Sequence, residues 1–184
     1  MKNVFKLRRY KFAAASATEA IAFGAARPPY NDQKVLQWIE FMEGQNIKRV
    51  CCLLFPAQLN HYSGLLEVYR DHFGPSQICW APIEDFQLVN YEMLNQTILP
   101  FLSMANQHHE KVVVHCSGGV GRTGQVLAAW LVSGRGFSPQ SAIAAVKQTG
   151  RNPHEAAIGA FLKGQNPFKE IAKFHALLEH CQQC

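Results

Sequence analysis

The segment that most constrains the fold is KVVVHCSGGVGRTGQVLAAWLVSG, residues 111–134. Its first six residues are mostly apolar, which is typical of a strand buried on both faces of a parallel sheet. Three glycines follow within five residues, and an apolar stretch with helical periodicity comes next. A strand, a glycine-rich turn and a helix are the parts of an α/β unit. In such units, ligand sites lie at the carboxyl ends of the strands.

The rest of the chain alternates in the same way. Short apolar runs predict buried strands, and longer segments with helical spacing predict helices between them. The expected strands are 47–55, 77–83 and 111–116, and the expected helices are 30–46, 63–74, 90–110, 122–136, 138–150, 154–163 and 167–181. This order predicts an α/β fold with a central, mostly parallel sheet flanked by helices, and a helical C-terminal part.

Capping residues support these helix boundaries. Asn31 and Asp32 can cap the first helix, Ser63 the second, and Ser138 the helix that begins with a proline at 139. Pro100 lies inside the long segment 90–110, where its missing N–H predicts a kink.

Length and composition indicate one globular domain over residues 1–184. The chain has 48% hydrophobic and 17% charged residues, and no apolar run is long enough to cross a bilayer. Ser16, Thr18 and Glu19 interrupt the apolar part of the N-terminal segment, so a signal peptide is a poor match and export is the minor alternative. The net charge is +5, but no basic stripe with interleaved aromatic residues indicates nucleic-acid binding.

The cysteines favour a reducing, cytoplasmic location. Cys51 and Cys52 are adjacent in an apolar run, which is typical of buried thiols rather than of a disulfide framework. The alternative is that one of them pairs with Cys116 under oxidation. Cys181 and Cys184 have the spacing of half a zinc site, but no second pair completes it, so no metal and no cofactor is expected.

The turn between strand and helix favours anion binding. Gly118, Gly119 and Gly121 allow several backbone N–H groups to point inward together, next to a helix N-terminus. Arg122 adds a planar group that can bind two oxygens of an oxyanion. The same groups favour the thiolate form of Cys116. One loop therefore provides both a nucleophile and a binding site for a tetrahedral oxyanion such as phosphate.

The ten residues HCSGGVGRTG resemble the signature of the cysteine-based protein tyrosine phosphatases. The loop is most similar to the compact dual-specificity branch, which includes the kinase-associated and small archaeal-type phosphatases. The resemblance implies that Cys116 is the nucleophile and that Arg122 binds phosphate. It further implies that Thr123 donates a hydrogen bond to the Cys116 sulfur and that His115 orients the loop through a backbone hydrogen bond. The phosphoryl oxygens would be bound by the backbone amides of Ser117, Gly118, Gly119, Val120, Gly121 and Arg122.

A leaving alkoxide or phenolate needs a proton, so a general acid is required. The resemblance implies an aspartate some thirty residues before the cysteine. WAPIEDFQ, residues 80–87, provides Asp85 at that place, with Glu84 as the less favoured candidate. Farther along the chain, Arg151 either frames the pocket or lies in a surface loop.

These assignments predict a monomeric protein phosphatase for phosphotyrosine, with phosphoserine and phosphothreonine as further candidates. The expected partner is a phosphoprotein or phosphopeptide, with no membrane and no nucleic acid. Phosphoinositide or inositol-phosphate phosphatases and RNA 5′-triphosphatases are alternatives with the same chemistry. Their loops often carry an extra basic residue, whereas the five intervening residues here are Ser, Gly, Gly, Val and Gly. A non-catalytic phosphopeptide-binding module is a third alternative, and a sulfur transferase or arsenate reductase is a fourth.

Overall fold

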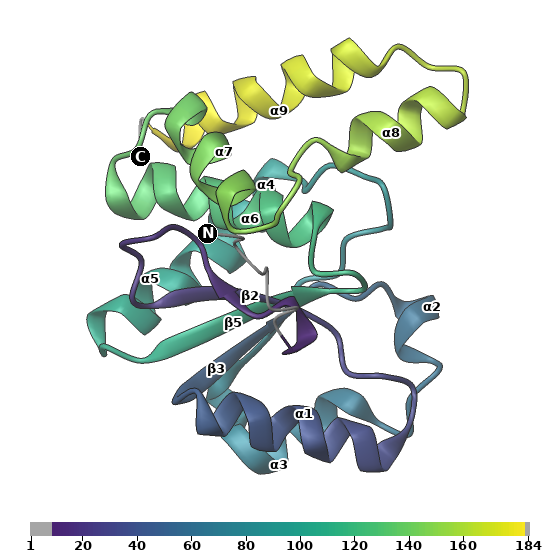
Figure 1. Cartoon of the computed structure of the whole chain (residues 1–184), viewed down its shortest axis with the longest axis vertical. Helices are drawn as coiled ribbons and strands as arrows, with labels where there is room; N and C mark the ends of the chain where they lie inside the picture. Colours follow the sequence, from purple (N-terminus) through teal and green to yellow (C-terminus); the bar gives the residue numbers. More distant parts are fainter. Residues whose placement is uncertain (1–8, 183–184) are drawn as a thin grey trace, which may run out of the picture.

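The computed structural model describes residues 9–182, so Cys184 lies outside the described residues. Within this part of the chain, one sheet has the strand order β1-β2-β5-β3-β4 (Figure 1). Strand β1 is antiparallel to β2, and the other neighbouring pairs are parallel. The predicted mostly parallel sheet is therefore confirmed. The strands are β1 (Ala13–Ala14), β2 (Ala22–Ala26), β3 (Ile47–Cys52), β4 (Ile78–Trp80) and β5 (Lys111–Cys116).

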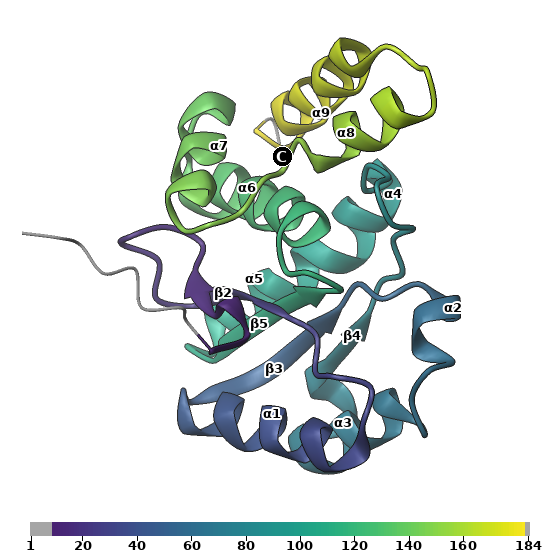
Figure 2. The same cartoon turned by 45° about the vertical axis from the view of Figure 1, so that its right-hand side comes forward.

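Helices cover both faces of the sheet (Figures 1 and 2). The alternation of side chains along β5 divides the core in two. Val112 and Val114 face one hydrophobic cluster, whereas Val113 faces the other. The first face packs against α5 (Leu99–Gln107), α6 (Gly121–Arg135), α7 (Pro139–Gln148) and α9 (Pro167–Cys181), and the second against α1 (Asp32–Gly44) and α3 (Leu65–Phe73).

Two of the predicted caps are present and one is displaced. The side chain of Asn31 accepts a hydrogen bond from the N–H of Lys34 at 3.1 Å, and Ser138 accepts one from the N–H of Ser141 at 3.2 Å. Helix α3, however, is not capped by Ser63. Its N-cap is Gly64, which has a φ of 87°. Glycine adopts this left-handed conformation without strain, so the chain turns into the helix one residue later than predicted.

The predicted kink at Pro100 takes the form of a change in helix type. The segment consists of α4 (Tyr91–Met93), a π-helical turn (Leu94–Ile98) and α5. Proline has no N–H to donate, and its ring crowds the carbonyl one turn earlier. The wider π-helical turn directly before Pro100 is consistent with relief of this crowding.

Strands β1 and β2 and helix α2 (Pro56–Leu59) were not predicted from the sequence. Strand β2 consists of Ala, Phe, Gly, Ala and Ala, and this composition has low β propensity. The small residues instead allow close packing. A Cβ atom at Gly24 would lie 2.8 Å from Cγ2 of Thr123 and 2.8 Å from Nε of Arg151. Tertiary packing therefore stabilises this strand in spite of its weak local preference.

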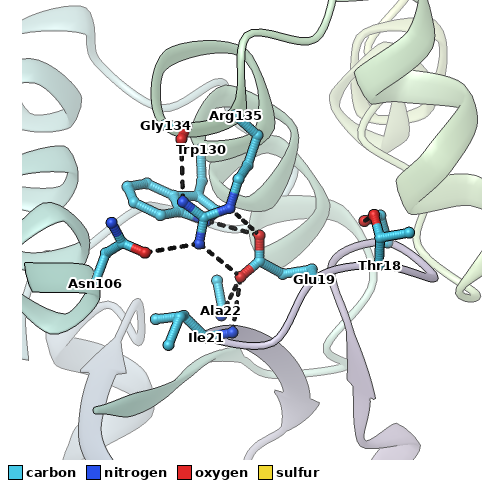
Figure 3. A network of polar contacts seen from close by, with 9 residues as sticks. Thr18, Glu19, Ile21, Ala22, Asn106, Trp130, Gly134 and Arg135 are labelled. Atoms are coloured by element: carbon cyan, nitrogen blue, oxygen red, sulfur yellow. Dashed lines mark hydrogen bonds and ion pairs between the residues drawn. The ribbon is translucent and has the colours of Figure 1, made fainter. Parts of the chain in front are cut away.

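Glu19 lies in the connection between β1 and β2 and binds this connection to α6 (Figure 3). Its carboxylate accepts hydrogen bonds from Nε and Nη2 of Arg135 at 2.8 and 3.0 Å, and from the N–H of Ile21 at 2.7 Å. Burial alone would raise the pKa of Glu19, but these donors together hold it below its ordinary value. A residue that interrupts the apolar N-terminal segment is thus a buried structural anion.

Cys51, Cys52, Cys79 and Cys116 are buried free thiols, and Cys181 is buried as well. Cys51 and Cys52 lie on β3, as the prediction of buried core thiols requires. Cys52 is paired with His115 on the neighbouring strand β5. Cys52 belongs to the core on the side of α1, whereas Cys116 belongs to the core on the other face of the sheet. Among residues 9–182, no group of three or more potential ligands could hold a metal ion. None of the described helices is long and apolar enough to span a membrane.

Candidate active site

The carboxyl ends of four parallel strands bring the functional loops together. Ala26 at the end of β2 is opposite Cys116 at the end of β5. On the other side of β5, Cys52 is opposite His115, and Trp80 of β4 is opposite Cys52. The loops that follow β2, β3, β4 and β5 therefore leave the same edge of the sheet, where ligand sites of α/β proteins lie.

The cysteine loop, residues 116–122, is held by backbone hydrogen bonds from its neighbours. The N–H of Arg27 donates to the carbonyl oxygens of Cys116 and Ser117 at 3.0 and 3.3 Å. Gly119 has a φ of 66°, and a Cβ atom there would collide with the backbone of Ala25. The turn thus requires glycine at 119 for both its conformation and its space.

Cys116 and Thr123 lie at the base of this loop. Cys116 is 2% exposed and Thr123 is fully buried. Within the described part of the chain, the Thr123 hydroxyl has no hydrogen-bond partner, so the expected bond to the Cys116 sulfur is not formed in this structure. The hydroxyl remains available as a donor at the start of α6.

Arg122 connects the cysteine loop to the acid loop, which we define as residues 82–87. Its Nη2 lies 3.1 Å from Oδ1 of Asp85, and its Nη1 donates to the carbonyl oxygen of Ile83 at 2.8 Å and to Oε1 of Gln58 at 2.9 Å. Asp85 and Glu84 are both exposed to solvent, and it is Asp85 that reaches the arginine of the cysteine loop. Gln58 lies in helix α2 and was not predicted as a site residue.

His115 lies under the loop with its ring in the core on the side of α1. Its Nε2 forms a hydrogen bond with the hydroxyl of Tyr69 at 3.2 Å, and its ring packs edge-on against Trp38. Burial lowers the pKa of His115 to about 3, and the positive charge of Arg122 acts in the same direction. The imidazole is therefore neutral at physiological pH. The backbone of Cys116 lies close enough to the ring to oppose this shift.

Arg151 is buried beneath the cysteine loop rather than exposed at the surface. Its side chain donates to the carbonyl oxygens of Gly119 at 2.7 Å and of Gly24 at 2.6 Å. Because Gly119 is in the loop and Gly24 is in β2, Arg151 holds the loop against the sheet. This position favours the first of the two sequence interpretations, in which Arg151 frames the pocket.

Two further charged residues border the loop and were not found from the sequence. Nε of Arg27 lies 3.4 Å from Oγ of Ser117, and its guanidinium lies 3.4 Å from the centre of the Tyr30 ring. Glu155 packs so closely against Gly121 that a Cβ atom at 121 would collide with its carboxylate. Burial and the negative charge of Asp85 raise the pKa of Glu155, against opposing contributions from the N–H of Gly121 and from Arg122.

The arrangement of Cys116, Arg122 and Asp85 at the end of a parallel sheet defines the class of cysteine-dependent phosphatases. Within this class, the family model of the dual specificity phosphatase catalytic domain matches residues 37–157. The chain belongs to this family.

Curated relatives of the chain include the rat and human proteins named dual specificity protein phosphatase 5. The Rattus norvegicus protein is 27% identical over 131 residues, which cover 67% of this chain and 33% of the relative. The Homo sapiens protein is 26% identical over 129 residues, which cover 66% of this chain and 33% of the relative. The chain thus spans about a third of the length of these relatives.

Solved structures share the fold at low sequence identity. The active form of Tk-PTP is 21% identical with a TM-score of 0.64, and the match covers 90% of this chain and 93% of that one. PTPMT1 in complex with PI(5)P is 11% identical with a TM-score of 0.67, covering 94% and 97%. Kinase associated phosphatase is 20% identical with a TM-score of 0.62, covering 78% and 86%. These likenesses confirm the predicted α/β fold.

Proposed function

We propose that this chain hydrolyses phosphotyrosine in proteins, with phosphoserine and phosphothreonine as further candidate substrates, through a cysteinyl-phosphate intermediate on Cys116. The observation that carries the proposal is the contact between Arg122 and Asp85. It brings a phosphate-binding group and a proton donor to the loop that holds the buried thiol. A site that only binds phosphate has no need of this combination.

The proposed reaction has two steps. In the first, the Cys116 sulfur attacks phosphorus, an S–P bond forms and the ester O–P bond breaks, and Asp85 gives its proton to the leaving oxygen. In the second, the Asp85 carboxylate takes a proton from water, the water oxygen bonds to phosphorus and the S–P bond breaks, which releases inorganic phosphate. Arg122 and the N–H groups of the loop hold the other phosphoryl oxygens throughout.

Two buried side chains are proposed as positioning residues for Cys116. The Thr123 hydroxyl would donate a hydrogen bond to the sulfur as it leaves phosphorus, and the absence of a competing partner in the described structure supports this role. The neutral ring of His115, held between Trp38 and Tyr69, would keep the backbone at Cys116 in place.

The lack of a basic side chain at residues 117–121 supports a substrate with a single phosphate. Phosphoinositides and triphosphorylated RNA carry several phosphates, and extra cations in the loop would bind them more tightly. PTPMT1 has been solved with PI(5)P, and its likeness to this chain shows the fold alone. A phosphoinositide and triphosphorylated RNA therefore belong in the substrate panel, beside phosphotyrosyl and phosphoseryl peptides.

The test is hydrolysis of an aryl phosphate by the wild type and by the variants Cys116→Ser, Asp85→Asn and Glu84→Gln. We expect turnover by the wild type and none by Cys116→Ser. Asp85→Asn should lose the basic limb of the pH–rate profile, whereas Glu84→Gln should retain it. Turnover by Cys116→Ser at the wild-type rate would exclude the nucleophile assignment. Wild-type protein that binds phosphopeptides without turnover would indicate the non-catalytic module.

We further propose that residues 1–184 form one catalytic domain that acts as a monomer in the cytoplasm. The free thiols of Cys51, Cys52 and Cys79 support a reducing location. Light scattering on the purified protein measures its molar mass, and the proposal expects the mass of one chain.

A further inference from the structure

Helix α8 (Glu155–Leu162) presents its large apolar side chains to solvent and its small ones to the protein. Ala156, Ala160 and Gly159 are buried, together with Ala157. In contrast, Ile158 is 48% exposed, Phe161 68% and Leu162 74%. An ordinary surface helix has the opposite arrangement, with large apolar residues turned towards the core. The outer face of α8 therefore has the composition of a buried surface, although it is exposed to solvent.

The small residues on the inner face of α8 are explained by contact with the acid loop. A Cβ atom at Gly159 would lie 2.5 Å from Cβ of Phe86, so only glycine allows the loop to approach the helix this closely. That requirement explains Gly159 and its small neighbours. It does not explain why Phe161 and Leu162, rather than polar residues, occupy the outer face.

The turn that joins α8 to α9 lies at the edge of the molecule (Figures 1 and 2). Phe168, the second residue of α9, is 76% exposed. We define the hairpin tip as four exposed apolar side chains of α8 and of the start of α9, namely Ile158, Phe161, Leu162 and Phe168. Exposed apolar groups gathered in this way mark interaction sites in soluble proteins.

Basic side chains surround the hairpin tip. Lys163, Lys169 and Lys173 are exposed on the same turn and helix. Two acids lie in the same stretch, since Glu155 begins α8 and the half-buried Glu170 pairs with Lys173 at 2.6 Å. Lys163, Lys173 and Glu170 also line a cavity of about 160 Å³ between the hairpin and Phe86. Residues 155–173 thus carry three lysines and two acids, a net charge of +1, beside a polar recess.

We propose that the hairpin tip docks on the surface of an anionic lipid bilayer. Phenylalanine and leucine side chains flanked by lysines are typical of segments that lie in the membrane interface, where the rings enter the acyl boundary and the ammonium groups contact lipid phosphates. Helix α8 has eight residues, so the contact is peripheral.

A bilayer fits this surface better than a second copy of the chain. A two-fold dimer built on the hairpin tip would bring Lys163 and Lys169 of both copies to one interface, where the like charges would repel. An anionic bilayer instead complements them. The surface also begins next to the acid loop, since Phe86 follows Asp85 directly. This docking departs from the sequence-based expectation of no membrane partner and holds for whichever phosphate ester is the substrate.

The experiment is co-sedimentation of the full-length protein with vesicles. Two compositions are compared, phosphatidylcholine alone and an equimolar mixture with phosphatidylglycerol. The variants are Phe161→Ser/Phe168→Ser, which removes the two rings, and Lys163→Glu/Lys169→Glu, which reverses two charges. The matched control is Leu36→Ser/Met104→Ser, because these side chains are 43% and 48% exposed on α1 and α5, away from the hairpin. Turnover of an aryl phosphate shows that each variant is folded.

We expect the wild type to bind the mixed vesicles, and the binding to weaken as salt is raised. The phenylalanine variant should bind about tenfold more weakly or worse, and the charge-reversal variant more than about fivefold more weakly. The control should bind like the wild type. Binding that is equal in the wild type and both hairpin variants, or no binding to mixed vesicles, overturns the proposal. A wild-type dimer in light scattering that the phenylalanine variant dissociates would assign the surface to a second copy instead.

Discussion

Gly118 and Gly119 are adjacent in the cysteine loop but meet different structural demands. Gly119 has a φ of 66° and packs against the backbone of Ala25, with no room for a side chain. Nothing lies within 4 Å of the position that a Cβ atom at Gly118 would occupy. Only Gly119 is therefore required by the geometry of the turn.

We predict that Gly119→Ala lowers the free energy of unfolding by about 2 kcal/mol, because alanine is strained in the left-handed region and its methyl group collides with Ala25. The variant should also lose turnover, since the loop that surrounds Cys116 must shift. Urea denaturation measures the first effect and aryl phosphate hydrolysis the second. Gly118→Ala is the control for stability and should change it by less than about 0.5 kcal/mol. Equal losses in the two variants would contradict this account.

At the scale of single residues, sequence reasoning found the groups that are close together in the chain. His115, Cys116, Arg122 and Thr123 occur within nine positions, so their proximity follows from the strand–turn–helix unit. Arg27, Gln58 and Glu155 come from segments that are distant in the chain, and their positions depend on the order of strands in the sheet. No local pattern contains that order.

At the scale of elements, long-range polar contacts stabilise segments whose secondary-structure propensity is low. The connection between β1 and β2 has little apolar material of its own, and Glu19 joins it to Arg135 near the end of α6 (Figure 3). Arg135 also donates to Asn106 on α5 at 2.9 Å. One ion pair therefore connects an edge of the sheet to two helices.

We predict that Glu19→Gln lowers the free energy of unfolding at pH 7 by about 2 kcal/mol, because a neutral amide cannot satisfy both guanidinium donors of Arg135. The pKa of Glu19 is lowered in the folded protein. Its contribution to stability is therefore present above the ordinary value of 4.5 and is lost as the pH falls through the lowered value.

Urea denaturation of the wild type and Glu19→Gln at several pH values measures this effect. The difference between them should shrink towards acid pH. The exposed residue Glu40 provides the control variant Glu40→Gln, which should match the wild type. A difference that stays constant down to acid pH would show that the charge of Glu19 is not its source.

Elements with strong local signals were predicted well, and those without them were not. Helix α1 runs from Asp32 to Gly44 after the Asn31 cap, as its spacing indicated. Strand β2 was missed because its alanines and glycine are suited to close packing rather than to strand formation. The π-helical turn before Pro100 was missed because the sequence indicates only that a regular helix is disturbed there.

At the scale of the whole molecule, the sheet separates two cores that meet at the active site. Alternating strands and helices predicted this layered arrangement. They did not show that His115 would be inserted in the core on the side of α1 while Cys116, its neighbour, faces the other core. Because His115 is both a core residue and a neighbour of the cysteine loop, its protonation affects global stability and the site together.

The pH dependence of global stability follows from the buried histidine. An ordinary histidine has a pKa of 6.5, whereas that of His115 is lowered to about 3. Between these values the unfolded chain takes up a proton that the folded protein does not, so stability falls as the pH decreases from about 6.5. Glu155 acts in the opposite direction, because its raised pKa lets the folded protein take up a proton before the unfolded chain does. Burial also lowers the pKa of His154, which therefore acts in the same direction as His115.

We therefore predict that the free energy of unfolding of the wild type decreases by about 1 kcal/mol per pH unit between pH 6 and pH 5 from this one group. His115→Gln should remove that slope, since glutamine does not titrate, even if it lowers stability at pH 7 by disturbing the core. The control His108→Gln changes an exposed histidine at the end of α5 and should keep the wild-type slope. Urea denaturation at closely spaced pH values gives the slopes directly. If the slopes of the wild type and His115→Gln agree, another group causes the acid sensitivity, and the neutral buried imidazole is not the link between the core and the cysteine loop.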